Sequence, residues 1–456
     1  MFISRWGGDT LIELSVEVIT FLMIAGIIVG VMTGFPLAFV VGSIGLIMGY
    51  LLLGNASFEI LYSRLYSLSL NYPLLAVPLF TFMGVVLQRS GIADGLFDAL
   101  YLWLGGFRGG LAVATIIFGT VLAACLGVIT ASVTMLTLIA LTPMVKRGYD
   151  KSLAAGAVCA GGTLGILIPP SVMLVIYGPM AMVSVGKLFM AAFMPGLLLC
   201  GLYCTYVAVQ CVRKPDWGPP VPKEDRNVPF AVKTRMLLYS LVPPLLLIVS
   251  VLGTIFLGIA PPTEAASVGA FAAMVLAIVY RKFSWNLLKG VSLDTMRVSA
   301  FVLLIGCLSF AFVGVFISVG CGDVVAKLIM ATPGGKWGAF FMVMFLVFIL
   351  GMLIDWIGIV FIMVPILAPI GPELGFDPLW FGMMICVNLQ MSFMTPPFAV
   401  SIFVCRGTAA PELGVTMSDI IRGVIPFVGI IIVCLLLCTI FPQIILWLPS
   451  QMMVGW

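Results

Sequence analysis

Long apolar stretches follow one another along almost the whole chain and are separated by short polar turns. Crossing a membrane takes about 20 mainly apolar residues, so these stretches predict membrane-spanning helices, although several are too short or too broken to cross alone. The candidate spans lie near residues 16–33, 36–53, 74–88, 111–128, 133–145, 153–178, 188–212, 236–258, 263–280, 298–320, 338–354, 357–371, 379–404 and 423–447. The pattern predicts an all-α polytopic membrane protein.

Three stretches depart from this pattern. Residues 57–70 and 92–103 mix aromatic and apolar residues with isolated charges, which is typical of helices that lie in the membrane surface or brace mobile parts. Met1–Ser15 carries arginine, aspartate and glutamate and has no small-residue cleavage site. We therefore expect an interfacial lead-in there and not a cleaved signal peptide.

The longest polar stretch of the chain, residues 212–235, is rich in lysine and arginine. Loops with an excess of these residues usually lie on the cytoplasmic side of the membrane. We expect a cytoplasmic linker that divides the chain into two halves, 1–211 and 236–456.

The two halves repeat one another in the order of their motifs. Gly148-Tyr149-Asp150 begins 21 positions before Pro169, and Gly375-Phe376-Asp377 begins 21 positions before Pro396. Each motif follows an apolar run that ends in proline and, further upstream, a glycine-led cluster of small or polar residues, at 127–133 and 351–356. This ordered agreement predicts an internal structural repeat.

Each repeat has two features that an ordinary membrane helix lacks. The glycine-led cluster is typical of the tip of a re-entrant hairpin, because irregular backbone at membrane depth is tolerated only inside protein or beside a cavity. The Pro-Pro pairs predict broken helices near 161–171 and 388–398, because proline has no backbone N–H. Facing tips and breaks would surround a hard cation such as sodium with oxygen atoms. The alternative is that each pair only kinks a helix and that neighbours bond the freed groups.

The candidate ligands follow from these breaks. Carbonyls freed for an ion are expected at Gly165, Ile168 and Pro169 in the first repeat and at Ser392 and Thr395 in the second. Thr130 and Ser132 would add hydroxyl ligands in the first tip. Asp355 lies in the second tip between apolar neighbours, where a carboxylate is either functional or caps a helix start.

Composition narrows the environment and the chemistry. Apolar residues make up 62% of the chain and charged residues only 9%, whereas soluble domains have about 25% charged residues. We therefore expect the protein surface to face a lipid bilayer, and the sequence has no signature of nucleic-acid binding. The chain contains no histidine, the commonest general base, and no phosphate-binding loop motif. These absences argue against an enzyme and against ATP-driven transport.

The motif Gly162-Thr163-Leu164-Gly165-x-x-Ile168-Pro169-Pro170-Ser171 resembles the hallmark of the large membrane subunit of tripartite ATP-independent periplasmic (TRAP) transporters. The runs 146–150, 352–355 and 388–397 resemble the same family, and the similarity covers nearly the whole chain. Two positions differ. The first tip reads Thr130-Ala131-Ser132-Val133 where the family typically has Ser-Gly-Ser-Ser, and Ser392 stands where a glycine is usual.

The resemblance implies an inverted-repeat, elevator-type transporter in the bacterial inner membrane that takes up a small organic acid, such as a dicarboxylate, together with Na⁺. It implies no organic cofactor. Two partners are expected: a small four-helix membrane subunit, here as a separate chain, and a periplasmic substrate-binding protein. The alternative is a self-sufficient ion-coupled anion carrier that needs no binding protein.

Transferred onto this sequence, the resemblance implies two sodium sites and a substrate site between the tips. The first sodium site is expected near Thr130, Ser132, Gly165, Ile168 and Pro169, and the second near Gly351, Ser392, Thr395 and Phe398. Substrate contacts are expected from Thr163, Asp355, Asn388 and Gln390.

Overall fold

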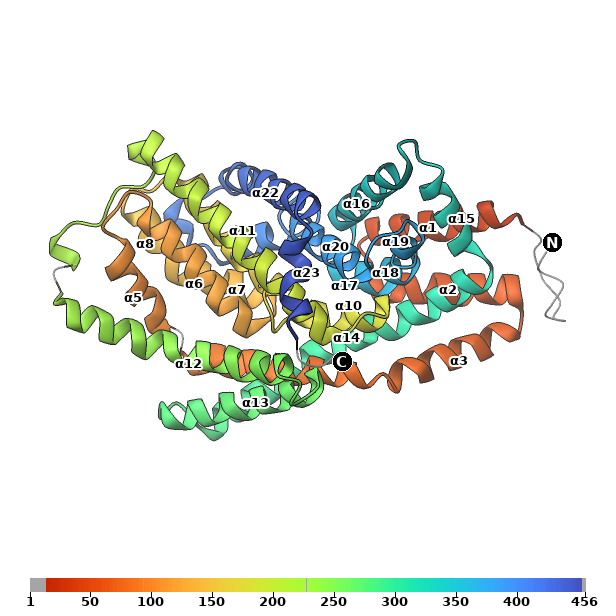
Figure 1. Ribbon diagram of the computed structural model, residues 1–456, viewed down its shortest axis with the longest axis horizontal. Helices are drawn as coiled ribbons and strands as arrows, with labels where there is room; N and C mark the ends of the chain where they lie inside the picture. The colour runs from red at the N-terminus through yellow and green to blue at the C-terminus, as the bar shows by residue number, and fades with distance from the viewer. Residues whose placement is uncertain (1–13, 93, 227, 453–456) are drawn as a thin grey trace.

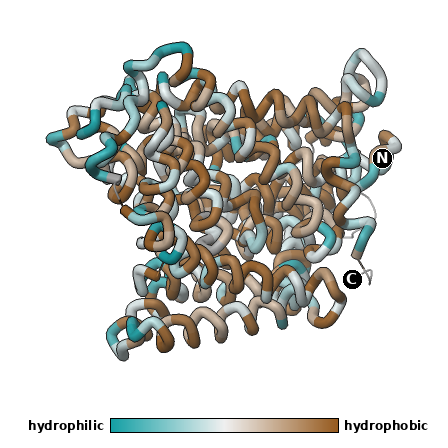
Figure 2. The backbone as a smooth tube through the Cα atoms, turned by 60° about the vertical axis from the view of Figure 1, so that its left-hand side comes forward, coloured by the Kyte–Doolittle hydropathy of each residue, from teal (hydrophilic) through white to brown (hydrophobic). Residues whose placement is uncertain are grey.

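The structure is a computed structural model that describes residues 14–92, 94–226 and 228–452, and every regular element within these ranges is a helix. In this part of the chain nine helices are long and apolar enough to cross a membrane, or ten when one bent pair is counted as a span. Hydrophobic residues follow the helices, and hydrophilic residues gather mainly at the turns (Figure 2). The expected all-α polytopic class is confirmed.

The helices of the first half run from α1 to α11 (Figure 1). In chain order they are α1 (Val16–Met32), α2 (Leu37–Leu53), α3 (Ala56–Ser69), η2 (Tyr72–Leu75), α4 (Ala76–Ser90), α5 (Asp94–Leu104), α6 (Gly110–Leu126), α7 (Ile129–Leu136), η3 (Thr137–Leu141), α8 (Thr142–Lys146), α9 (Lys151–Leu167), α10 (Val172–Ala181) and α11 (Val185–Arg213).

Two short turns, η4 (Pro215–Trp217) and η5 (Glu224–Arg226), precede the second half. Its helices are α12 (Phe230–Phe256), α13 (Pro262–Val279), α14 (Trp285–Ser318), α15 (Cys321–Met330), α16 (Gly335–Leu353), α17 (Trp356–Gly358), η6 (Ile359–Met363), α18 (Val364–Leu367), α19 (Ile370–Glu373), α20 (Pro378–Ser392), α21 (Val400–Thr408), η7 (Pro411–Leu413), α22 (Met417–Ile440) and α23 (Gln443–Ser450).

A helical hairpin followed by an interrupted helix occurs in each half. The first hairpin joins α6 to α7–α8, and the second joins α16 to α17–α19. The second arm of each hairpin contains a π-helical turn. Helices α9 and α10 flank the first Pro-Pro pair, and α20 and α21 flank the second. The order hairpin, helix, break, helix is therefore present twice.

The Gly-aromatic-Asp motifs form the same joint between hairpin and helix in each half. Gly148 and Gly375 have φ angles of +83° and +78°, a conformation that glycine adopts readily. Asp150 and Asp377 then cap α9 and α20, because each carboxylate accepts a backbone N–H from the first helical turn. The motif thus ends one element and begins the next.

The helices pack in two main groups. In one, α14, the longest helix with 34 residues, packs against α2, α3 and α4, and α13 packs against α4 and α12. In the other, α6 and α22 pack against α9, α16 packs against α20, and α11 contacts α6, α20 and α22. Contacts of α14 with α17 and η6, and of α10 with α4, join the groups. The breaks lie where the groups meet.

The polar stretch predicted as a linker over 212–235 is irregular only between α11 and α12, because both apolar helices continue into it. Its backbone is bonded to the base of the first hairpin. The Gly218 carbonyl accepts from the Gly109 N–H at 2.8 Å, and the Trp217 carbonyl accepts from the Asp150 N–H at 3.0 Å.

Candidate functional site

A cavity of about 380 Å³ lies where both hairpin tips and both helix breaks meet. The first tip contributes residues 127–130 and the second contributes 355–357. Ile166 and Val172 border the cavity beside the first break, and Phe398 and Val400 border it at the second. One face of α14, beginning at Arg297, forms the remaining wall.

The first tip is a short irregular turn between α6 and α7. Gly127 has a φ of +63°, and Val128 is extended. A Cβ on Gly127 would lie 3.8 Å from the Pro170 carbonyl oxygen, so the tip touches the first break. The Ser132 hydroxyl donates to the Val128 carbonyl at 3.1 Å, while Thr130 borders the cavity.

The first break is buried throughout residues 168–171, and α9 and α10 are bent by 46° across it. Because its two prolines have no N–H, the Gly165 and Ile166 carbonyls lose their helical donors. The Ser171 hydroxyl donates to the Ile166 carbonyl. No donor in the described part of the chain bonds the Gly165 carbonyl.

The second tip and the second break are in direct contact. The Phe398 N–H donates to the Met352 carbonyl at 3.0 Å. Gly351 packs so closely on Ser392 that a Cβ at position 351 would stand 1.7 Å from the Ser392 Oγ. That hydroxyl is buried and has no hydrogen-bond partner among the described residues. Both peptide bonds between the paired prolines, 169–170 and 396–397, are cis.

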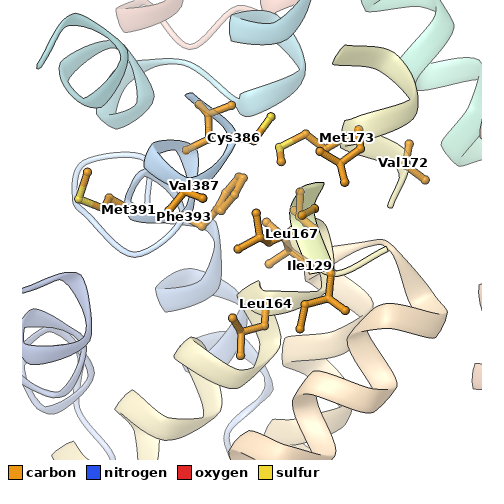
Figure 3. Close-up of a cluster of buried hydrophobic side chains, with 14 of the residues drawn as sticks. Ile129, Leu164, Leu167, Val172, Met173, Cys386, Val387, Met391 and Phe393 are labelled. Carbon is orange, nitrogen blue, oxygen red and sulfur yellow. The ribbon is translucent and has the colours of Figure 1, made fainter. Parts of the chain in front are cut away.

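An apolar cluster joins the first break to the second broken helix. Side chains of α9 and α10 meet side chains of α20 and of the residue that follows it (Figure 3). The labelled members are Ile129, Leu164, Leu167, Val172, Met173, Cys386, Val387, Met391 and Phe393. The two breaks therefore lie beside one another although more than 200 residues separate them in the sequence.

Comparison with known proteins identifies this arrangement. Residues 23–444 match the family described as "Tripartite ATP-independent periplasmic transporter, DctM component". The chain belongs to the DctM family. It is 33% identical over 401 residues to the C4-dicarboxylate TRAP transporter large permease protein DctM of Pseudomonas aeruginosa, covering 88% of this chain and 91% of that protein.

Other similar DctM-family proteins are named for other substrates. The chain is 32% identical to the isethionate TRAP transporter permease protein DctMQ of Oleidesulfovibrio alaskensis, covering 82% of this chain and 58% of that protein. Further relatives are named for sialic acid and ectoine. Among solved structures, the Alcanivorax borkumensis YdaH transporter has a TM-score of 0.60 at 15% identity and covers 88% of each chain. This last likeness concerns the fold alone.

The resemblance to TRAP large subunits is thus confirmed. Members of the DctM family are transporter permeases and not enzymes. Their general role is secondary transport together with a small membrane subunit and a periplasmic binding protein.

The residues predicted for the two sodium sites are arranged differently. In the second set, Gly351 and Ser392 are in contact, and the Thr395 hydroxyl donates to the Met391 carbonyl at 2.9 Å. In the first set, the tip and the break touch, but the Ser132 hydroxyl already has a bond. Each set thus contains one hydroxyl that is already bonded and one oxygen without a bond among the described residues, the Ser392 hydroxyl in the second set and the Gly165 carbonyl in the first.

Only one of the four predicted substrate residues borders the cavity. Asp355 occupies the N-cap position of α17 and lines the cavity, without a capping hydrogen bond from its side chain. Thr163 is buried and donates to the Ala160 carbonyl at 3.0 Å. Asn388 and Gln390 are also buried; the Asn388 amide donates to the Met344 carbonyl at 2.6 Å, and the Gln390 amide has no partner among the described residues.

Arg297 is a cavity residue that the sequence reasoning missed. It lies on α14, just before the predicted span near 298–320, and its side chain is 75% exposed. The available signal was an isolated arginine at the edge of an apolar stretch, three residues after Asp294. That signal does not reveal the hairpin tips that α14 faces.

Proposed function

We propose that the chain couples the uptake of a small organic anion to Na⁺ across the bacterial inner membrane. The substrate arrives from a periplasmic binding protein, and a small four-helix membrane subunit completes the complex. The observation that carries this proposal is the meeting of two tips and two breaks at one cavity. Half-helix ends and unwound carbonyls of this kind bind ions and substrates in secondary transporters.

The second tip and break support a sodium site near Gly351, Ser392, Thr395 and Phe398. The Ser392 carbonyl has no helical donor, because Pro396 stands four residues later. The Ser392 hydroxyl is buried without a hydrogen-bond partner among the described residues, and leaving such a group unpaired costs about 1–3 kcal/mol. A hard cation takes oxygen ligands, so a bound Na⁺ would remove this cost.

The first tip and break support a second ion position near Thr130, Ser132, Gly165, Ile168 and Pro169. Here the available oxygen atoms are the unbonded Gly165 carbonyl and the Thr130 hydroxyl at the cavity. The Ser132 hydroxyl, which donates to a carbonyl, still has lone pairs that accept a cation.

An elevator-type movement is part of the proposal. It is supported by the two packing groups, in which α2–α4 and α12–α14 form one set of contacts and the hairpins with the broken helices form the other.

The proposal also includes the arrangement of the two halves in the membrane. The hairpins would be re-entrant, and the halves would be inverted repeats. Cysteines placed at Asp150 and Asp377 should then react with impermeant thiol reagents from opposite sides of the membrane. Reaction of both from one side would contradict the inverted arrangement.

The proposed substrate class rests on the relatives, which are named as transporters of C4-dicarboxylates and of isethionate. An organic anion with a carboxylate is the proposed substrate. Asp355 would contact it in the cavity, whereas Thr163, Asn388 and Gln390 are buried outside the cavity lining and would contact it only after the site rearranges. The self-sufficient carrier remains the second candidate, and it predicts uptake without a binding protein.

Uptake by the reconstituted complex tests the function. Proteoliposomes containing the chain and the candidate small subunit would receive labelled malate, which carries a hydroxyl as well as carboxylates, and the candidate binding protein, at constant pH and voltage. Uptake should collapse when Na⁺ is replaced by K⁺ and when the binding protein is omitted. Undiminished uptake driven by a proton gradient alone would contradict sodium coupling, and undiminished uptake without the binding protein would favour the self-sufficient carrier.

A further inference from the structure

Two side chains with opposite charges line the cavity. Arg297 belongs to α14, and Asp355 belongs to the tip of the second hairpin. No ion pair joins them, since none of the ion pairs among the described residues involves Asp355. Asp355 thus has no ion-pair partner among the described residues, and the ion-pair partner of Arg297 there is Asp294, which does not line the cavity.

Arg297 is held at the cavity by a neighbouring ion cluster. Its guanidinium lies 3.8 Å from the Asp294 carboxylate, one turn earlier on α14. Arg89 of α4 donates to the other oxygen of Asp294, through Nε at 2.8 Å and through Nη2. Two arginines thus share one aspartate, and this wall of the cavity keeps a net positive charge.

The rest of the nearby lining is apolar. Val298, Phe301 and Val302 continue the face of α14 that Arg297 begins, and Ile357 and Val400 complete the opposite side. These apolar residues carry no charge that would offset Arg297 or Asp355, so the two charged side chains dominate the electrostatic potential of the cavity.

We propose that Arg297 recognises the oxyanion group of the transported molecule and that Asp355 recognises a hydroxyl or ammonium donor on the same molecule. This inference rests on the proposed function, because it assumes that the cavity is the substrate site. It narrows the substrate to organic anions that also carry a hydrogen-bond donor. A symmetric dicarboxylate would meet repulsion at Asp355.

The charge of the cavity can be measured without transport. In a cysteine-free background, Thr130→Cys places one thiol on the first tip, which borders the cavity. Its modification rates with a sulfonate-bearing and with a trimethylammonium-bearing methanethiosulfonate give an anion-to-cation rate ratio. The assay uses the full chain in detergent and needs neither a sodium gradient nor substrate, so its outcome is independent of the uptake experiment.

Arg297→Gln should lower the anion-to-cation ratio by roughly tenfold, because one lost charge affects the two reagents in opposite directions. Arg297→Lys should preserve the ratio. Lys289→Gln is the matched control, since Lys289 lies on the same helix, is exposed and does not line the cavity. Asp355→Asn should raise the ratio by a similar factor.

Variants are compared only as monodisperse protein of equal yield. If Arg297→Gln does not fold, the rate ratio of Arg297→Lys still tests the role of Arg297. A ratio for Arg297→Gln equal to that of Lys289→Gln, or a lowered ratio for Arg297→Lys, would overturn the role of Arg297. An unchanged ratio for Asp355→Asn would overturn the role of Asp355.

Discussion

The two helix breaks carry the same Pro-Pro pair but differ in how completely their polar groups are bonded. At the first break, residues 168–171 are buried, and the Ser171 hydroxyl takes up one of the two freed carbonyls. At the second, residues 396–398 are exposed, and the Ser392 hydroxyl is buried without a partner. The same local sequence signal can therefore leave a freed carbonyl bonded to a nearby hydroxyl in one repeat and a buried hydroxyl without a partner in the other.

The tips differ in a parallel way. Gly127 has a left-handed backbone, and an added Cβ would meet only ordinary van der Waals contacts, with its nearest neighbour at 3.5 Å. Gly351 is helical, and its constraint is the contact with Ser392. Glycine is required at the first tip by conformation and at the second by close packing.

The largest effect is expected from Gly351→Ala. The new methyl group would overlap the Ser392 side chain; overpacking typically costs about 1–3 kcal/mol, and the severity of this overlap leads us to expect the upper end of that range. Gly127→Ala should cost only about 1–2 kcal/mol, the cost of a left-handed backbone for a residue with a Cβ. Denaturant titration of the purified proteins measures both.

The double variant Gly351→Ala/Ser392→Gly is the control for that prediction, because it removes the side chain that the methyl group would meet. It should recover most of the lost stability. Failure to recover would mean that the cost of Gly351→Ala does not arise from this contact.

The next effect is expected from Ser171→Ala at the first break. It would leave the Ile166 carbonyl buried and unbonded, which costs about 1–3 kcal/mol. The free energy of unfolding should fall while the half-saturating sodium concentration stays unchanged. A large shift in sodium dependence with normal stability would contradict a purely structural role for the Ser171 hydroxyl.

Ser392→Ala should behave in the opposite way at the second break. In sodium-free buffer its stability should match or exceed that of the parent protein, because an unpaired buried hydroxyl has been removed. The stabilisation by added Na⁺, which would reach about 2.7 kcal/mol for a site at 100 times its Kd, should be reduced. Thermal unfolding in sodium and in potassium buffer separates these effects, and equal sodium stabilisation in both proteins would exclude this hydroxyl as a ligand.

The smallest effects are expected from Thr395→Val and Ser132→Ala. Each removes one hydroxyl that also bonds a backbone carbonyl, a change worth about 0.5–1.5 kcal/mol. The half-saturating sodium concentration should rise roughly two- to tenfold, and the two changes should combine almost independently if they belong to separate sites. Sodium titrations on expression-matched vesicles provide the measurement, and unaltered curves would remove both hydroxyls from the ion sites.

Several features of the site could be predicted because their causes are local. Gly148 and Asp150 end one helix and cap the next through contacts within a few residues. The interruptions at Pro169 and Pro396 follow from the missing N–H of proline. The predicted substrate residues Thr163 and Asn388 illustrate the limit, because their partners and their distance from the cavity depend on neighbouring helices.

The sequence by itself determined that this protein is a helical membrane protein of the DctM family with tips and breaks in each half, because apolar runs, glycine turns and proline pairs act over short distances. Only the tertiary structure decided that the Ser392 hydroxyl is buried against Gly351 without a partner, and that Arg297 shares a cavity with Asp355. Those outcomes depend on which helices come into contact, and the contacts of α14 with the second hairpin join segments that no local sequence pattern connects.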